Sequence, residues 1–277
     1  MTRRPGFLVY GLLAAFVLGS AFPFYWSVVI GSVTGQRASL DPQPLIPGDQ
    51  LLHNVSRVFD RIDFWSALAN SVLVSGISAL SVIIFSTLAG YAFAKLRFRG
   101  SNTLMVVVVA TIAIPTQLSL VPLYKEMANL HLTGTRFSVM LPWLVTAFGV
   151  FFMRQYLVDA IPDELIEAAR VDGCSMLRTF WTVAIPAARP AMAILGLFTF
   201  MQVWTDFMWP LISLRTGNVQ TLQTALDLLK VAPGQGEAAD MALVQAGALM
   251  ATVPLLILFI ATGRHLVTGI MQGAVKG

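Results

Sequence analysis

The sequence predicts an all-α protein that crosses a membrane six times, and three observations support this prediction. Of the 277 residues, 56% are hydrophobic and only 12% are charged, with a mean hydropathy of +0.74. Soluble globular chains carry about 25% charged residues, so this chain has too little polar surface to cover a body of its size in water. The apolar stretches are continuous and lack the alternation of membrane β-barrel strands. We therefore expect a polytopic helical membrane protein.

Six segments are apolar over about the 20 residues that a spanning helix needs. They lie at approximately Phe7–Gly31, Asn70–Ala94, Thr103–Tyr124, Phe137–Met153, Ala191–Leu214 and Leu243–Gly263. The third carries Pro115 and Pro122, which a spanning helix tolerates where its neighbours satisfy the freed carbonyls. The first could also be read as a secretory signal. Its apolar run is longer than the roughly 7–15 residues of a signal core, which favours a span.

The distribution of Lys and Arg predicts the orientation of these spans. With six spans both termini share one side, and that side holds eleven of the 18 Lys and Arg, against seven on the other. Because loops rich in these residues stay in the cytoplasm, both termini are expected there. Residues 1–69 then form the first span and an outer loop with a short surface helix. Residues 70–277 form a core of five spans that includes a long cytoplasmic loop, 154–190.

Several other functions find no support in the residues. The net charge of +4 comes from dispersed Lys and Arg, with no basic run to bind nucleic acid. The single Cys174 permits no internal disulfide, and His53, His131 and His265 have no metal-ligand spacing. No phosphate-binding glycine loop and no cluster of catalytic side chains is present. We therefore expect neither an enzyme nor a metal or other cofactor bound to this chain.

Local signals divide the cytoplasmic loop into two short helices. Pro162 suits the first position of a helix, and Gly173 can end it in a left-handed conformation. Ser175 can then cap a second helix through Trp181, which Pro186 is expected to stop. Two helices that meet at a glycine form a compact elbow. Taken alone, this pattern is also typical of an amphipathic pair resting on lipid headgroups.

The spacing within this loop adds a more specific indication. Glu167-Ala168-Ala169, Asp172-Gly173, Phe180, Pro186 and Pro190 resemble the signature loop of ABC importer permeases. Further segments resemble landmarks of the maltose-type carbohydrate permeases, which have a MetI-like transmembrane domain: Asn70-Ser71, Ala89–Ala94, Ile114-Pro115, Val121–Tyr124, Ile161–Leu165, Trp204–Phe207 and the tail from Gly269 to Gly277. The chain departs from that pattern at Thr205, often Asn in the family, and at Gln223, often Pro. Both departures bear on the identity of the solute.

The resemblance implies a type I ABC importer fold and a permease subunit in the bacterial inner membrane, transporting a sugar or sugar-like solute. It implies as partners a second permease subunit in a heterodimer, two ATP-binding subunits that use ATP and Mg, and an extracytoplasmic solute-binding protein. It also implies a set of residues that couple this chain to the ATPases: Glu164, Glu167, Ala168, Ala169, Asp172, Gly173, Phe180 and Pro186. Glu167 and Asp172 suit contacts with basic groups of an ATPase, or they cap and solubilise the elbow.

The solute path is marked by fewer residues. Asp206 is the one carboxylate within the expected spans, and an ionisable residue there is a functional candidate by default. Gln202, Asp206 and Trp209 fit one stripe of a helix, and Gln117 and Trp204 are further candidates. Trp209 is expected in the aromatic belt at the membrane interface. Lining of a pore and a structural role both stay open for Gln202 and Asp206.

An ion-coupled secondary transporter is the main alternative function. Such a protein needs intramembrane ionisable groups or broken helices in an inverted repeat. One peripheral carboxylate and no inverted repeat favour the importer. A single-chain channel would leave the elbow without a role.

Overall fold

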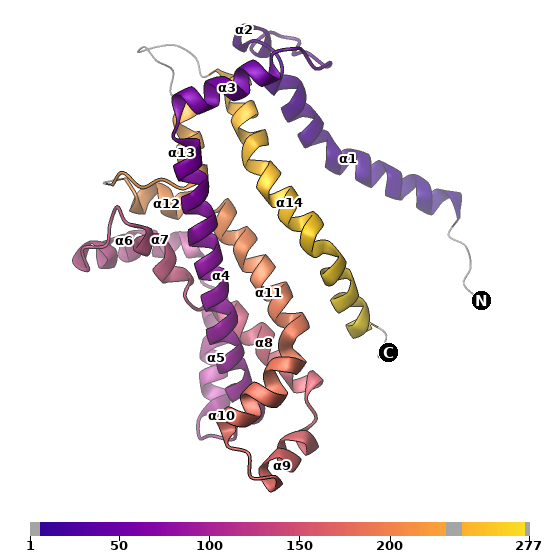
Figure 1. Ribbon diagram of the computed structural model, residues 1–277, viewed down its shortest axis with the longest axis vertical. Helices are drawn as coiled ribbons and strands as arrows, with labels where there is room; N and C mark the ends of the chain where they lie inside the picture. The colour runs from indigo at the N-terminus through magenta and orange to yellow at the C-terminus, as the bar shows by residue number, and fades with distance from the viewer. Residues whose placement is uncertain (1–5, 216, 231–239, 275–277) are drawn as a thin grey trace. The chain divides into compact units, whose positions relative to one another are not determined.

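The computed structural model describes residues 6–215, 217–230 and 240–274, with side chains through Thr262. All regular elements in this part of the chain are helical (Figure 1), which confirms the all-α prediction. The chain forms two compact units, residues 1–65 with 224–257 and residues 66–223 with 258–277. Three of the basic residues that predict the orientation in the membrane, Arg3, Arg4 and Lys276, lie outside the described residues. The last three residues of the tail also lie outside them. The division at residue 69 stays a prediction.

The first unit joins the start of the chain to a segment near its end. Its helices are α1 (Phe7–Gly31), α2 (Gly35–Ala38), α3 (Leu51–Arg61), the second half of α13 (Leu222–Asp227), η4 (Leu228–Lys230) and the first half of α14 (Met241–Ala274). Helix α3 is the short helix expected in the outer loop. Asn54 on α3 donates from Nδ2 to the carbonyls of Gly31 and Val33, both at 2.9 Å, and the Arg57 guanidinium meets Asp240 at 2.7 Å. These contacts fix α3 to the end of α1 and the start of α14.

The second unit contains the remaining elements. They are α4 (Phe64–Lys95), α5 (Ser101–Ile112), η1 (Thr116–Ser119), α6 (Leu120–Asn129), α7 (Arg136–Met140), η2 (Leu141–Trp143), α8 (Ala147–Ala160), α9 (Asp163–Val171), α10 (Met176–Thr179), the π-helical turn η3 (Phe180–Ala184), α11 (Ile185–Thr205) and α12 (Met208–Ser213). Helices α4, α5, α8 and α11 run side by side, and α9 and α10 lie at one end of them (Figure 1). We call this the elbow end and the other the far end.

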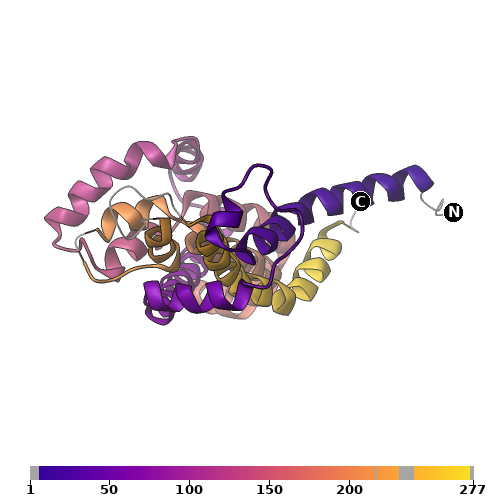
Figure 2. The ribbon, with the colours of Figure 1, turned by 90° about the horizontal axis from the view of Figure 1, so that it is seen from above.

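Within the residues that the structure describes, five helices are long and apolar enough to cross a membrane, and a sixth crossing follows if one bent pair counts as a span. The first crossing, Phe7–Gly31, has the bounds that the sequence predicts. The bent pair is the expected third span, in which Ser101–Ile112 and Thr116–Asn129 meet at 92°. The prediction of a continuous helix there is wrong. Pro115 has an extended backbone (ψ 124°), and a proline disfavours the helical conformation in the residue before it. Helix α6 consequently projects to one side of the bundle instead of continuing along α5 (Figure 1 and Figure 2).

The predicted bounds of the fifth crossing are wrong at both ends. Its apolar helix runs from Met176 to Thr205, where Ala191–Leu214 was expected. Pro186 does not stop the helix that begins at Met176: it is the second residue of α11, which follows directly on a π-helical turn. The π-helical turn η3 precedes it and joins α10 to α11 without a loop. The second helix of the elbow is therefore the beginning of the fifth crossing and not a separate element.

A continuous apolar core holds the elbow end together. It joins α4, α8, α9 and α11 through fully or almost fully buried side chains: Val82, Tyr91, Met153, Leu157, Ile161, Ile166, Phe180, Ala184, Ala188, Ala191 and Leu195. Glycines allow α4 and α8 to approach closely. A Cβ atom on Gly90 would lie 2.7 Å from the Met153 Cβ and 2.8 Å from the Arg154 backbone nitrogen. The Arg154 nitrogen belongs to the backbone of α8, so no change of side-chain rotamer can relieve this contact.

We expect Gly90→Ala to lower the melting temperature of the purified permease by about 2–6 °C, because overpacking a tight contact costs about 1–3 kcal/mol. Gly76→Ala on the same helix is the matched control, since a Cβ there meets nothing within 4 Å. Thermal unfolding followed by tryptophan fluorescence measures both variants. Equal melting temperatures for the two would contradict the close packing of α4 on α8.

Candidate functional site

The elbow is built from α9, a sharp turn and α10. Asp163 and Glu164 occupy the first turn of α9, where carboxylates complement the positive end of the helix dipole. Gly173 has φ +75°, its N–H donates to the Arg170 carbonyl at 3.0 Å, and the Cys174 N–H donates to the Ala169 carbonyl at 2.9 Å. This pair of bonds is a Schellman motif. The predicted end of the helix at Gly173 is confirmed.

The turn continues directly into the next helix. The Ser175 hydroxyl accepts the Arg178 N–H at 3.3 Å, so Ser175 caps α10 as its sequence position predicts. Phe180 turns inward and is 5% exposed, with its ring centroid 5.4 Å from that of Tyr91 on α4. The elbow is therefore closed by local hydrogen bonds and anchored by an aromatic contact.

The outward surface of the elbow combines exposed apolar side chains with carboxylates. Ile166 is the only residue of α9 that is buried. We call a subset of these exposed residues the elbow face; its members are Glu164, Leu165, Glu167, Ala168, Val171, Asp172, Met176, Leu177 and Trp181. Asp163, Arg170 and Arg178 are also exposed on the same segment. Val171 is 88% exposed and Trp181 is 64% exposed. Apolar side chains gathered on a projecting surface are typical of a protein interaction site.

The structure brings together most of the predicted coupling residues, but not all of them. Glu164, Glu167, Ala168, Asp172 and Gly173 are exposed on the elbow, and Ala169 is half-buried. Phe180 belongs to the core beneath the elbow. Pro186 is exposed on α11, beyond the elbow turn. The signature spacing thus mixes surface positions with positions that shape the backbone.

A residue that the sequence did not single out connects α4 to the elbow. The Lys95 ammonium lies 2.8 Å from Asp163 Oδ1 and 3.4 Å from the Val158 carbonyl oxygen. The hydrogen bond and the positive charge of Lys95 lower the pKa of the Asp163 carboxyl below its ordinary value. Lys95 and Asp163 are 68 positions apart. Their separate signals, a charge after a span and an acid at a helix start, do not reveal that they meet.

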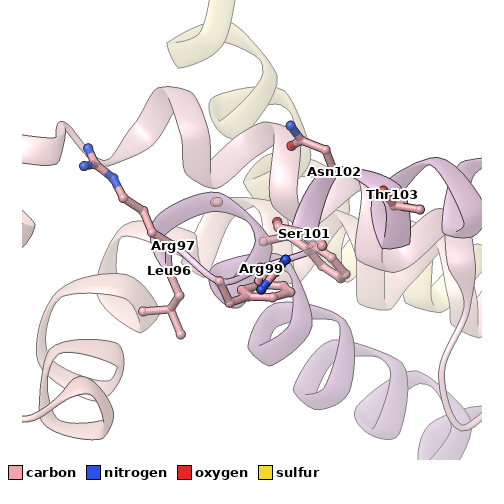
Figure 3. A pocket seen from close by; sticks show the side chains of 10 residues that line it. Leu96, Arg97, Arg99, Ser101, Asn102 and Thr103 are labelled. Carbon is pink, nitrogen blue, oxygen red and sulfur yellow. The ribbon is translucent and has the colours of Figure 1, made fainter.

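A pocket follows the turn between α4 and α5 at the same end of the second unit. It is lined by residues Phe93, Ala94 and Leu96 to Thr103. Arg97 and Arg99 both border it, but the Arg97 side chain extends away from Arg99 (Figure 3). The two guanidinium groups therefore do not converge on one ligand position.

The residues expected along the solute path are spread over several elements. Gln117 is exposed on η1 and Gln202 is exposed on α11. Trp204 is 2% exposed, and its indole Nε1 has no hydrogen-bond partner within the described residues. Asp206 follows the last residue of α11 and has an extended backbone, and its Oδ1 accepts the Trp209 N–H at 3.4 Å.

Two expectations at the far end are wrong. Gln202, Asp206 and Trp209 do not share a helical stripe, because α11 ends at Thr205. Trp209 does not lie in an exposed aromatic belt: it is 4% exposed and its Nε1 donates to the Ser138 carbonyl at 2.9 Å. The helix ends at Thr205, and the chain then turns so that Trp209 contacts α7. No local sequence signal marks that turn.

The landmark pair Asn70-Ser71 has a structural role at the far end. Asn70 accepts from Arg136 Nε at 2.7 Å and donates to the Gln220 carbonyl at 2.9 Å. The Ser71 hydroxyl accepts the Leu222 N–H at 2.7 Å. The start of α4 thus holds the segment that leads into α13.

The chain matches the family model described as "Binding-protein-dependent transport system inner membrane component" over residues 82–267. It is 31% identical to the melibiose/raffinose/stachyose import permease protein MelC of Bacillus subtilis, with 99% of each chain covered. It is 33% identical to the arabinooligosaccharides transport system permease protein AraQ of Halalkalibacterium halodurans, covering 83% of this chain and 81% of the relative. These matches cover the elbow and most of the crossings.

Among solved structures, a chain of a bacterial ABC transporter that imports the acidic polysaccharide alginate superimposes with a TM-score of 0.76. The match covers 95% of this chain and 99% of that one at 23% identity. At this identity the likeness concerns the fold. It confirms the predicted type I permease fold.

We expect Gly173→Ala to loosen α9, because a left-handed conformation costs a non-glycine residue about 1–2 kcal/mol. Gly173→Asn should be milder, since Asn tolerates this conformation better. Amide hydrogen exchange in residues 163–171 should quicken by about fivefold to thirtyfold in the alanine variant. Gly100→Ala is the control, since Gly100 also has a positive φ (+86°) with open space around it. If Gly173→Ala and Gly100→Ala change the amide hydrogen exchange of α9 equally, the Schellman motif at Gly173 does not stabilise α9.

Proposed function

Because the chain belongs to the family of binding-protein-dependent transport system inner membrane components, we propose that it is a permease subunit of an ATP-driven importer for a sugar or sugar-like solute. The observation that carries the proposal is the elbow. It presents an exposed face of apolar and acidic side chains on a segment whose other side is part of the core of the second unit. Such a segment can transmit motion of a docked partner to the crossings.

The solute class is supported by the relatives. Two of them are permeases for melibiose, raffinose and stachyose and for arabinooligosaccharides. A third, 28% identical, belongs to a transport system for sn-glycerol-3-phosphate. The exposed Gln202 and half-buried Asp206 offer the hydrogen-bonding groups that a polyhydroxylated solute requires. An oligosaccharide is the solute we propose, with Gln117, Gln202, Trp204 and Asp206 as candidate contacts along its path.

The proposed complex contains three further kinds of component. A second permease subunit completes the translocation path, and an extracytoplasmic binding protein delivers the solute. Two ATP-binding subunits use ATP and Mg, neither of which this chain binds. The elbow and both termini then face the cytoplasm, as the Lys and Arg distribution predicts.

The proposed mechanism is mechanical. An ATP-binding subunit holds the elbow face, with Glu164, Glu167 and Asp172 meeting basic groups and Ala168 allowing a close backbone approach. Movement of that subunit carries α9, and the buried Ile166 and Phe180 carry the crossings with it. ATP and the loaded binding protein drive transport only if each binds one arrangement of the crossings better than the other.

The roles within the signature follow from exposure. Glu167 and Asp172 make partner contacts in this proposal, whereas Gly173 supplies the left-handed turn. Ala169 and Phe180 face inward and maintain the shape of the elbow. Pro186 starts α11 and acts through the helix geometry.

We expect Glu167→Lys to leave the permease in the membrane but to reduce ATP-driven uptake at least about tenfold, because the substitution places a cation against basic groups. Gly173→Asp should also uncouple uptake, through the strained turn. Radiolabelled oligosaccharide uptake by vesicles containing the whole complex is the measurement. Asp60→Lys, the same change of charge on an exposed position of α3, is the control.

Uptake should track ATP and survive collapse of the ion gradient. Uptake that instead follows the gradient would identify a secondary transporter. Normal ATP-driven uptake by both elbow variants would remove the coupling role from this loop.

A further inference from the structure

Lys95 makes an unusual set of contacts at the elbow end. It is the last residue of α4, and its side chain is only 5% exposed. An ammonium group at this depth is stable only when it is paired and hydrogen-bonded. Lys95 meets this requirement with one partner from α8 and one from α9, Val158 and Asp163.

The α8 partner is a carbonyl that the helix itself leaves open. Helix α8 ends at Ala160, so the Val158 carbonyl is one of the last four and has no helical donor. The residue four positions on is Pro162, which has no N–H to offer. The Lys95 ammonium, 3.4 Å away, supplies the missing donor and places a positive charge at the negative end of the α8 dipole.

The α9 partner supplies a second point of attachment for that helix. Ile166 is the only buried residue within α9, and the other anchors of the elbow, Ile161 and Phe180, lie outside this helix. Asp163 lies one turn before Ile166, on the same side of the helix. With Ile166 in the core and Asp163 held at 2.8 Å by Lys95, two points fix the direction of the helix axis.

From this geometry we infer that Lys95 is a positioning residue for transport, a joint that fixes the angle of α9 against α4 and α8. The inference rests on the proposed function, because it assigns Lys95 to the transmission of motion from the elbow to the second and fourth crossings. Lys95 does not belong to the elbow face and needs no contact with a partner. Its removal should leave the partner docked on an elbow whose direction is no longer set.

The test compares Lys95→Met, which keeps the apolar stem without the charge, with Lys95→Arg, which restores a cationic donor. Both are assembled in the complete complex with its ATP-binding subunits and binding protein in vesicles. The readout is the number of solute molecules transported per ATP hydrolysed. Arg99→Met is the control, a nearby exposed basic residue without a partner within the described residues.

We expect Lys95→Met to retain its ATP-binding subunits on purification. It should transport about tenfold less solute per ATP, an effect within the range that is typical of coupling between two sites. Lys95→Arg and Arg99→Met should remain within about twofold of the unaltered complex. Transport per ATP that is unchanged in Lys95→Met would overturn the inference. Failure of Lys95→Arg to restore coupling would overturn it too.

If Lys95→Met does not accumulate, Asp163→Ala provides the same test, since it leaves the Lys95 contact with Val158 intact. An unchanged ratio in Asp163→Ala would then overturn the inference. Glu167→Lys, measured in parallel, separates the two proposals. Uncoupling by Glu167→Lys together with normal coupling in Lys95→Met would reject the joint and keep the proposed function. Uptake independent of ATP in the unaltered complex would reject both.

Discussion

The burial of Ile161 and Ile166 in the same core as Leu157, Tyr91 and Phe180 is the interaction on which the second unit depends. These two isoleucines lie on either side of the chain turn between α8 and α9. Each fully buried aliphatic side chain contributes about 1.5–3 kcal/mol, whereas solvent screens an ion pair whose acidic partner is exposed, as Asp163 is. Apolar burial therefore attaches the elbow to the crossings, and the Lys95–Asp163 pair sets its direction.

A second constraint acts wherever a helix is interrupted. Backbone groups buried away from water need partners, and this chain supplies them from distant side chains. At the far end, Trp209 donates to the Ser138 carbonyl, and Asn70 donates to that of Gln220. At the elbow end, Lys95 donates to the Val158 carbonyl ahead of Pro162. The breaks in the helices are thus part of a hydrogen-bonded framework and not loose connections.

The two constraints together give the second unit a rigid core and an elbow face that is exposed to a partner. Close packing at Gly90 and the shared apolar core join α4, α8 and α11 at the elbow end. The elbow face beyond that core carries little packing of its own, and Val171 and Trp181 are largely exposed. If a partner binds this face and moves it, the shared core should move α4, α8 and α11 with it.

Local chemistry decides which of these features the sequence predicts. The first crossing, the glycine turn at Gly173 and the cap at Ser175 depend on neighbours along the chain, and the sequence predicts each of them. The predicted bounds of the fifth crossing are wrong because the apolar run continues past Thr205, whereas the helix ends there, and because the helix passes through the π-helical turn η3 into Pro186 without a break. Trp209 and Lys95 find their partners through tertiary packing 71 and 68 positions away. Their placement is not encoded in any local pattern.

In the proposed function, the elbow faces the cytoplasm and docks a nucleotide-hydrolysing subunit. Cys174 is the only cysteine, so Cys174→Ala gives a background in which Ala168→Cys can be labelled alone. A bifunctional photo-crosslinker on that cysteine, in the intact complex, is expected to capture the ATP-binding subunit. A membrane-impermeant thiol reagent applied from outside the cell should leave it unmodified. Labelling from outside, or capture of no nucleotide-hydrolysing subunit, would contradict the account.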